Sequence, residues 1–161
     1  MLDQVIDRLA KHFTTGVVSM AGPGLCFITV PRQEALGAIA FLKEQEGFCH
    51  LVLLTAVDYI EQGEFQLTYL LHHPVKKVDA GIRVMIERDN ASMLSAHELW
   101  PTMATYQREL REMFGIDFPG SPGVMDDFIL EGWQGIPPYR REFDTKAFAE
   151  SFYPQREGRE T

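Results

Sequence analysis

Cysteine is scarce in this sequence, and Cys26 and Cys49 are the only two among its 161 residues. Neither belongs to a CxxC pair or has a histidine at zinc-finger spacing, and an iron–sulfur cluster normally needs four thiolates. We therefore expect no cluster, no metal site and no other cofactor. Both cysteines fall in strand-like apolar stretches, so we interpret both as buried thiols in a protein from a reducing compartment.

Long hydrophobic runs are also missing. The best apolar stretch, from Phe48 to Val57, contains His50 and falls well short of the roughly 20 residues that a membrane-spanning helix needs. Asp3, Asp7 and Arg8 interrupt the first turns, so the N-terminus does not resemble a secretory signal. These absences predict a cytoplasmic protein that contacts a membrane only through a partner.

Positive charge is in deficit, with 15 Lys and Arg against 23 Asp and Glu and a formal net charge of -8. The basic residues do not cluster, so the chain should repel phosphate backbones, and we expect no nucleic acid partner. A chain of 161 residues that is 45% hydrophobic can bury one core but is too short for two independent ones.

Nucleotide-binding and catalytic motifs are absent as well. Gly22-Pro23-Gly24 is too short for a dinucleotide loop and precedes a strand, and the glycine-rich residues 115–123 include the acidic Asp117. His72 and His73 are consecutive on a predicted strand, so their side chains point to opposite faces and cannot share an ion. His50 is interpreted as a satisfied or edge-exposed strand histidine.

What is present is an alternation of helical and strand patterns, which predicts an α/β (α+β) protein with a mixed sheet and flanking helices. Apolar residues at helical spacing predict a first helix before Gly16, a second from residue 35 to about residue 42, and a third from about Pro101 to Phe114 that ends at Gly115. Period-two patterns and turn residues predict strands over residues 17–20, 25–30, 50–59, 64–72 and 82–87.

The predicted third helix carries four charged residues. Its apolar stripe (Met103, Tyr106, Leu110 and Met113) leaves Arg108, Glu109, Arg111 and Glu112 on or beside the exposed face. Glu109 and Glu112 could form a paired-carboxylate site for acid–base or metal chemistry. An intrahelical ion pair between Arg108 and Glu112, four residues apart, accounts for the same residues without catalysis, and we favour it.

After Phe118 the composition changes. Residues 119–161 hold 5 of the 9 prolines and 7 of the 18 aromatic residues, without a sustained period of 2 or 3.6. We predict an α/β domain over residues 1–118 and an extended C-terminal arm over residues 119–161. Because such an arm should not bury its aromatics by folding on itself, we expect much of it to dock on a partner protein. Tyr139, Arg140 and Arg141 are residue types enriched at interface hot spots.

The sequence LWPTMATYQRELREMFGIDFPG, residues 99–120, resembles the signature of the 30-kilodalton subunit family of NADH:quinone oxidoreductase, or complex I. Strand residues 54–59, 65–71 and 82–84 and the segment WQGIPPYRREF, residues 133–143, are similar to further family segments in the same order. The resemblance implies a cofactor-free subunit of a peripheral arm, packed against the large catalytic subunit and the small iron–sulfur subunit. It implies interface positions at Arg108, Glu109, Glu112, Phe114, Gly115, Ile116, Phe118, Gly120, Pro122, Trp133, Pro137, Tyr139, Arg140, Arg141 and Phe143.

The chain departs from the family pattern at three positions. Gln107 stands where the family has Glu, Glu112 where it has Asp, and Ser121 where it has His. The same family serves membrane-bound [NiFe] hydrogenases and formate hydrogenlyase-like complexes, so an equivalent subunit of such a complex is the alternative prediction. A free-standing enzyme that uses Glu109 and Glu112, and a free-standing binding module, are the other hypotheses.

Overall fold

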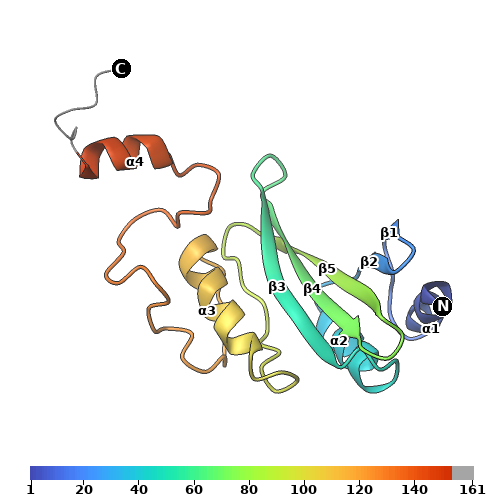
Figure 1. Ribbon diagram of the computed structural model, residues 1–161. Helices are drawn as coiled ribbons and strands as arrows, with labels where there is room; N and C mark the ends of the chain where they lie inside the picture. The colour runs from blue at the N-terminus through green and yellow to red at the C-terminus, as the bar shows by residue number, and fades with distance from the viewer. Residues whose placement is uncertain (154–161) are drawn as a thin grey trace.

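The computed structural model describes residues 1–153, which form a mixed five-stranded sheet with helices packed against it (Figure 1). The strands lie in the order β1-β2-β5-β4-β3, and only the pairing of β2 with β5 is parallel. The elements are α1 (Leu2–Ala10), β1 (Val18–Gly22), β2 (Leu25–Thr29), α2 (Ala35–Glu44), β3 (His50–Tyr59), β4 (Glu64–His73), β5 (Val78–Glu87), α3 (Met103–Phe114) and α4 (Thr145–Phe152). The predicted α+β class with a mixed sheet and flanking helices is confirmed.

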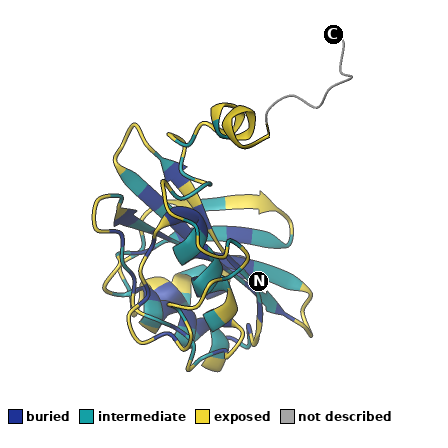
Figure 2. Ribbon diagram, turned by 90° about the vertical axis from the view of Figure 1, so that its left-hand side faces the viewer, coloured by how far each residue is buried: buried dark blue, intermediate teal, exposed yellow. Residues whose placement is uncertain are grey.

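One face of the sheet forms the core. In register across three strands, Leu54 pairs with Tyr69 and Tyr69 with Ile82, and all three side chains are buried. Because successive strand residues point to opposite faces, the alternate positions lie on a face that is largely half-exposed. The alternation is visible along the strands in Figure 2. Contacts of α1 with β2 and of α2 with β5 cover the buried face, and α3 packs against the edge strand β3.

Two hydrogen bonds hold β3 and the residue before it to α3 and to the segment that leads into α3. A bulge between Leu51 and Leu53 frees the carbonyl of Val52, which accepts from the Tyr106 hydroxyl at 3.0 Å. The Trp100 indole donates to the carbonyl of Cys49 at 2.8 Å. These side chains satisfy backbone groups that an edge strand otherwise leaves to water.

Two element boundaries differ from the prediction by more than a residue or two. β5 begins at Val78, four residues before the predicted start, because the loop-like Gly81 lies inside the strand, opposite the Phe27 ring of β2. α1 ends at Ala10, well before Gly16, because the following backbone has other partners. Thr14 donates to the Glu34 carboxylate, and Gly16 donates to the Thr29 carbonyl.

No helix among residues 1–153 is long and apolar enough to cross a membrane. Residues 154–161, the last part of the predicted arm, lie outside the described range.

The prediction that both cysteines are buried is wrong for Cys49, which is exposed, whereas Cys26 is fully buried. Cys49 follows Phe48, which fills the core, and the next side chain along an extended backbone points outward. Burial raises the pKa of the Cys26 thiol to about 11, so little reactive thiolate is present at neutral pH.

We expect a thiol reagent at pH 8 to label one cysteine quickly in the folded protein and both in denaturant. Cys49→Ser should abolish the fast phase, and Cys26→Ala should leave it intact. Labelling is followed by the absorbance of the released chromophore and located by mass spectrometry. Fast labelling of Cys26 in the folded Cys49→Ser variant would contradict this assignment.

A candidate subunit interface on helix α3 and the C-terminal arm

Helix α3 presents the signature residues between the sheet and the arm. Met103, Leu110 and Met113 bury its apolar stripe, as predicted, and Gly115 ends the helix in a left-handed conformation with φ 73° and ψ 30°. Gln107, one turn after Met103, is fully buried, and its side-chain oxygen accepts from the Ser95 hydroxyl at 2.7 Å. The sequence pattern did not identify this buried amide, because a polar residue on a helix is normally interpreted as exposed.

The predicted ion pair between Arg108 and Glu112 is wrong. Both oxygens of Glu112 accept hydrogen bonds from the arm: the backbone N–H groups of Phe128, Ile129 and Leu130 donate at 2.7, 2.9 and 3.2 Å. Arg108 lies over the Phe128 ring, with its guanidinium carbon 5.6 Å from the ring centre. Three donors in fixed positions hold a carboxylate better than one solvated side chain four residues away. The charged face of α3 therefore binds the arm.

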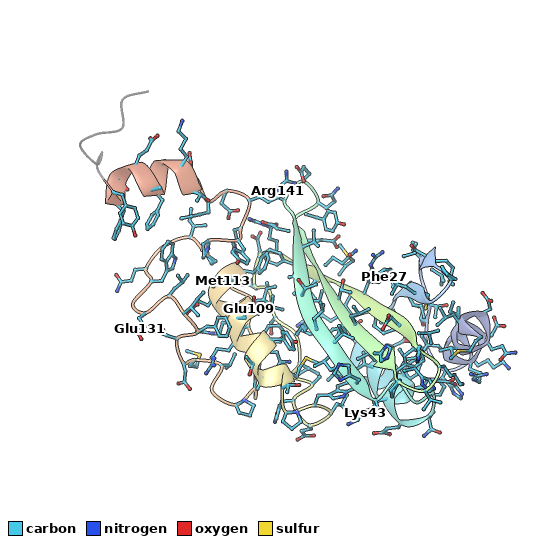
Figure 3. The ribbon with its side chains drawn as sticks, viewed as in Figure 1. Phe27, Lys43, Glu109, Met113, Glu131 and Arg141 are labelled. Atoms are coloured by element: carbon cyan, nitrogen blue, oxygen red, sulfur yellow. The ribbon has the colours of Figure 1, made fainter. Side chains whose placement is uncertain are left out.

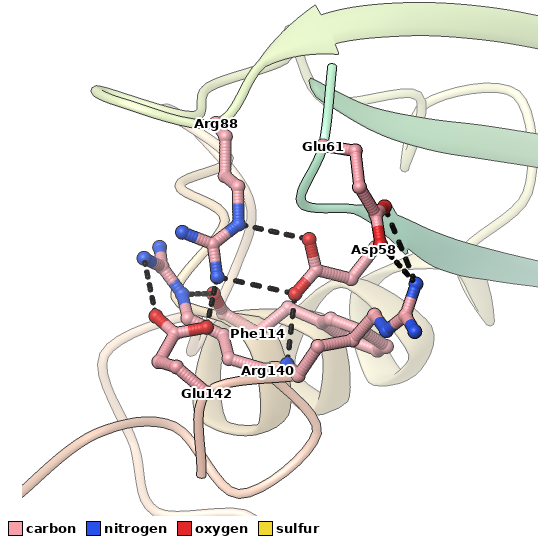
Figure 4. Close-up of polar contacts among 7 residues, drawn as sticks. Asp58, Glu61, Arg88, Phe114, Arg140 and Glu142 are labelled. Atoms are coloured by element: carbon pink, nitrogen blue, oxygen red, sulfur yellow. Dashed lines mark hydrogen bonds and ion pairs between the residues drawn. The ribbon is translucent and has the colours of Figure 1, made fainter. Parts of the chain in front are cut away.

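A second anchor holds the arm beside the last residues of α3, around Asp58 at the end of β3 (Figure 4). Arg88 donates to both oxygens of Asp58, at 2.8 and 3.2 Å, and the backbone N–H of Arg141 donates to one of them at 2.9 Å. The Asp58 side chain is only 2% exposed. Arg88 also pairs with Glu142, so the arm and the sheet share one network of charges.

Burial by itself would raise the pKa of the Asp58 carboxyl. The hydrogen bonds from Arg88 and from the Arg141 backbone outweigh that effect and hold the pKa below its usual range. Asp58 is therefore a carboxylate at neutral pH, and the cation of Arg88 is its necessary partner.

Backbone and aromatic contacts complete this second anchor. The Tyr139 N–H donates to the Met113 carbonyl at 2.9 Å, and Arg140 Nε donates to the Phe114 carbonyl at 2.6 Å. The rings of Phe114 and Tyr139 meet edge to face, with centres 5.6 Å apart. A side chain on Gly115 would come within 3.2 Å of both Pro137 and Arg140, so glycine here permits the close approach of the arm as well as the turn.

The arm folds partly on itself, which corrects the expectation that its aromatics could not pack together. Trp133, Phe143 and Phe148 lie with ring centres 5.0 to 5.6 Å apart, and Phe148 stacks on Phe152 at 5.0 Å. These four rings form what we name the aromatic cluster. Two of them belong to the unpredicted helix α4, whose first turn is capped by Asp144 through a 2.9 Å hydrogen bond from the Ala147 N–H. No residue of α4 is buried.

The predicted interface residues divide into four groups. Arg108, Glu112, Phe114, Gly115, Pro137, Tyr139, Arg140 and Arg141 meet where the arm is anchored, and Trp133 and Phe143 belong to the aromatic cluster. Glu109 is half-buried on α3 (Figure 3), and Gly120 and Pro122 are exposed in the following loop. Ile116 and Phe118 are fully buried in the core, so they cannot contact a partner.

Sequence reasoning missed Asp58 and Arg88. Asp58 continues the buried-face alternation of Leu54 and Ala56, and a carboxylate at such a position requires a cation nearby. That signal was available, but the identity of the cation was not, because Arg88 lies 30 residues away in sequence. Among residues 1–153 no group of three or more His, Cys, Asp or Glu side chains is placed to hold a metal ion.

Comparison with solved structures shows where this fold occurs. The membrane-bound sulfane sulfur reductase, an archaeal respiratory membrane complex, contains a chain with TM-score 0.88 and 23% identity, and the match covers 99% of this chain and 95% of that one. A trypsin-resistant fragment (1–134) of Nqo5 matches with TM-score 0.64 and 23% identity, over 75% of this chain and 97% of the fragment. At these identities the likeness shows a shared fold.

Sequence comparison is more specific. The C subunit of NADH-quinone oxidoreductase from Moorella thermoacetica is 32% identical over 147 residues, which cover 88% of this chain and 95% of that protein. The chain spans only 44% of the C subunit from Novosphingobium aromaticivorans, at 28% identity, and 20% of the C/D 2 subunit from Aquifex aeolicus, at 30% identity. The family described as "Respiratory-chain NADH dehydrogenase, 30 Kd subunit" matches residues 28–149. The chain therefore belongs to the 30-kilodalton subunit family of respiratory-chain NADH dehydrogenases, as the signature on α3 predicted.

Proposed function

We propose that this chain is a non-catalytic structural subunit of the peripheral arm of a complex I-type NADH:quinone oxidoreductase. In this role residues 1–118 form the rigid body, and the arm, residues 119–161, docks on the large catalytic subunit. The chain holds that subunit in register with the small iron–sulfur subunit, so that the distances for electron transfer to quinone are maintained. It sits on the cytoplasmic side and reaches the membrane only through the complex.

The observation that carries this proposal is that the arm is fixed in place and yet leaves its apolar side chains uncovered. Glu112 and Asp58 anchor it at two points, while Met125, Ile129 and Ile136 are 70%, 66% and 46% exposed. Phe152 and Tyr153, at the end of α4, are 66% and 76% exposed. In Figure 1, α4 projects away from the sheet, in keeping with the exposure of these side chains. An ordered, exposed apolar strip of this kind is typical of a protein–protein interface.

Two relatives support the placement beside a large subunit. In the Aquifex aeolicus relative, the part similar to this chain is fused in one polypeptide whose name combines the letters C and D, and fused subunits are commonly neighbours in their separate forms. The Nqo5 fragment that resists trypsin covers 75% of this chain, which supports a stable body distinct from a C-terminal extension.

The second candidate is the equivalent subunit of a membrane-bound hydrogenase or formate hydrogenlyase-like complex. It is favoured by the match to the sulfane sulfur reductase complex, which extends over 99% of the chain. Nickel-ligating cysteines in the large subunit that co-purifies with this chain would select this candidate, and their absence would select quinone reduction. A free-standing enzyme at Glu109 and Glu112 is disfavoured, because both oxygens of Glu112 already accept from the arm.

The arm model predicts that Phe152→Ser combined with Tyr153→Ser weakens binding to the large subunit about thirtyfold, as expected for the loss of hot-spot aromatics. Val75→Ser is the matched control, since Val75 is 84% exposed in the turn between β4 and β5, and it should change the affinity less than twofold. Affinity is measured by titrating each purified variant of this chain over the purified large subunit immobilised on a sensor surface. Equal affinities of the double variant and the control would refute docking through α4.

A further inference from the structure

The first strand of the sheet carries a surface that the arm does not use. β1 pairs with β2 on one side and is the end strand of the sheet on the other. Among residues 1–153 no side chain donates or accepts a hydrogen bond at the backbone of residues 18–22. An edge strand exposes alternate N–H and C=O groups that can pair with a further strand. Its exposed apolar side chains are Val18 and Met20, by 40% and 49%, and Val17 just before the strand is exposed by 72%.

This edge lacks the protection that edge strands usually carry. Residues 14–31 contain no Asp, Glu, Lys, Arg or His, although 24% of the whole chain is charged. Soluble proteins normally place charged side chains or proline on an exposed edge, which prevents pairing with other chains. The one irregularity of β1 is a register shift in its pairing with β2, between Met20 and Gly22 at the end of the strand. An uncharged, apolar edge that stays exposed would promote aggregation, so we expect it to be covered in the assembled protein.

We propose that an extended, uncharged segment of a partner protein in the complex adds to the sheet beside β1 as a sixth strand. Main-chain hydrogen bonds would give the affinity, and alternate apolar side chains would give the specificity.

A second copy of this chain fits the edge less well than a partner. Two five-residue strands paired about a two-fold axis bury on the order of a few hundred Å², which is below the roughly 1,200 Å² at which specific interfaces begin. In a complex that also binds the arm, a short added strand contributes to a larger total interface. β1 and α4 lie at opposite ends of the molecule in Figure 1, so the two contacts can be tested separately.

This inference rests on the proposed function, because it requires that the chain be part of a complex. The test compares backbone amide hydrogen exchange in the isolated chain with exchange in the complex purified from native cells through a tag on this chain. We expect exchange in a peptide covering residues 14–24 to slow about tenfold or more on assembly. Slowing in a peptide covering residues 144–153, without slowing in residues 14–24, would keep the proposed function and overturn this inference.

Variants of the edge provide a second test. Val18→Lys with Met20→Lys restores charge to exposed positions, and we expect it to lower recovery of this chain in the complex about tenfold. Val75→Lys is the control and should assemble like the unaltered chain. Normal assembly of the edge variant would overturn the proposal. So would a concentration-dependent dimer of the isolated chain that the edge variant abolishes, because the occupant would then be a second copy.

Discussion

Replacing Asp58 by alanine should lower the free energy of unfolding by roughly 3 to 5 kcal/mol, the cost of breaking a buried ion pair by removing one partner. Arg88 would remain 13% exposed with only Glu142 to neutralise it, and the Arg141 N–H would lose its acceptor. We expect the arm to detach there. Urea unfolding followed by tryptophan fluorescence measures the first effect, and limited trypsin digestion measures the second.

The digestion has a clear signature, because the chain has no Lys or Arg between Arg111 and Arg140. In the unaltered protein we expect early cleavage after Lys146, whose side chain is 85% exposed. In Asp58→Ala, cleavage after Arg140 and Arg141 should appear as well. Glu61→Ala is the matched control, because Glu61 pairs with Arg141 at 3.3 Å but is 63% exposed. Such surface pairs contribute less than about 1 kcal/mol to the free energy of unfolding. Equal losses of stability in Glu61→Ala and Asp58→Ala would therefore contradict the buried anchor.

The contribution of Asp58 should also depend on pH. Its pKa is lower in the folded protein than the ordinary value of 3.8, so the unfolded chain binds the proton more readily. The stability difference between the unaltered protein and Asp58→Ala should therefore be constant above about pH 5 and shrink as the pH falls through about 4 towards the lower folded pKa. A difference that grew on acidification would show that Asp58 is destabilised as an anion.

Gly81→Ala has the second largest expected effect, and overpacking should lower the free energy of unfolding by roughly 3 kcal/mol. The added Cβ would lie 2.3 and 2.6 Å from two carbons of the Phe27 ring. To make room, the ring would have to shift and disturb its contact with the Arg83 guanidinium, which lies 4.0 Å over its centre. Figure 3 shows Phe27 on β2, distant from Arg141 in the second anchor of the arm, so the arm should stay bound in this variant.

A double-mutant cycle identifies the cause. In a Phe27→Ala background the ring is gone, and Gly81→Ala should cost less than about 0.5 kcal/mol or stabilise slightly by restricting the unfolded chain. Gly24→Ala is the control, since a Cβ there finds its nearest neighbours at 3.8 and 3.9 Å. Equal losses from Gly81→Ala in both backgrounds would exclude the ring contact and leave the backbone of β5 as the cause.

The sheet was largely predictable because its signals are local. Period-two patterns located β3 and β4, and the αL position of Gly115 ended α3 where the sequence indicated. β5 was predicted too short because Gly81 resembles a turn residue. Glycine is needed there because a Cβ would meet the ring of Phe27 on another strand. A residue chosen for a non-local contact cannot be interpreted from its neighbours in sequence.

The candidate interface was predictable in its residues but not in its contacts. Arg108 and Glu112 have ideal spacing for an ion pair on α3, and nothing local reveals that three amides of residues 128–130 compete for the carboxylate. Helix α4 was hidden by its proline-rich surroundings, although Phe148 and Phe152 have helical spacing and Asp144 is a good capping residue. The partner of a side chain is set by tertiary structure, which spacing alone does not contain.

The single parallel pairing in the sheet constrains the order in which the chain folds during synthesis. β3, β4 and β5 are joined by short turns and can form a meander as soon as residue 87 leaves the ribosome. The β1–β2 hairpin is made first but cannot join the sheet until then, because Leu25 pairs with Asp79 and Thr29 with Arg83. During that interval the nascent hairpin has both long sides open and no charge to repel neighbours. Translation speed between residues 30 and 87 should therefore influence the soluble yield more than translation speed through the arm.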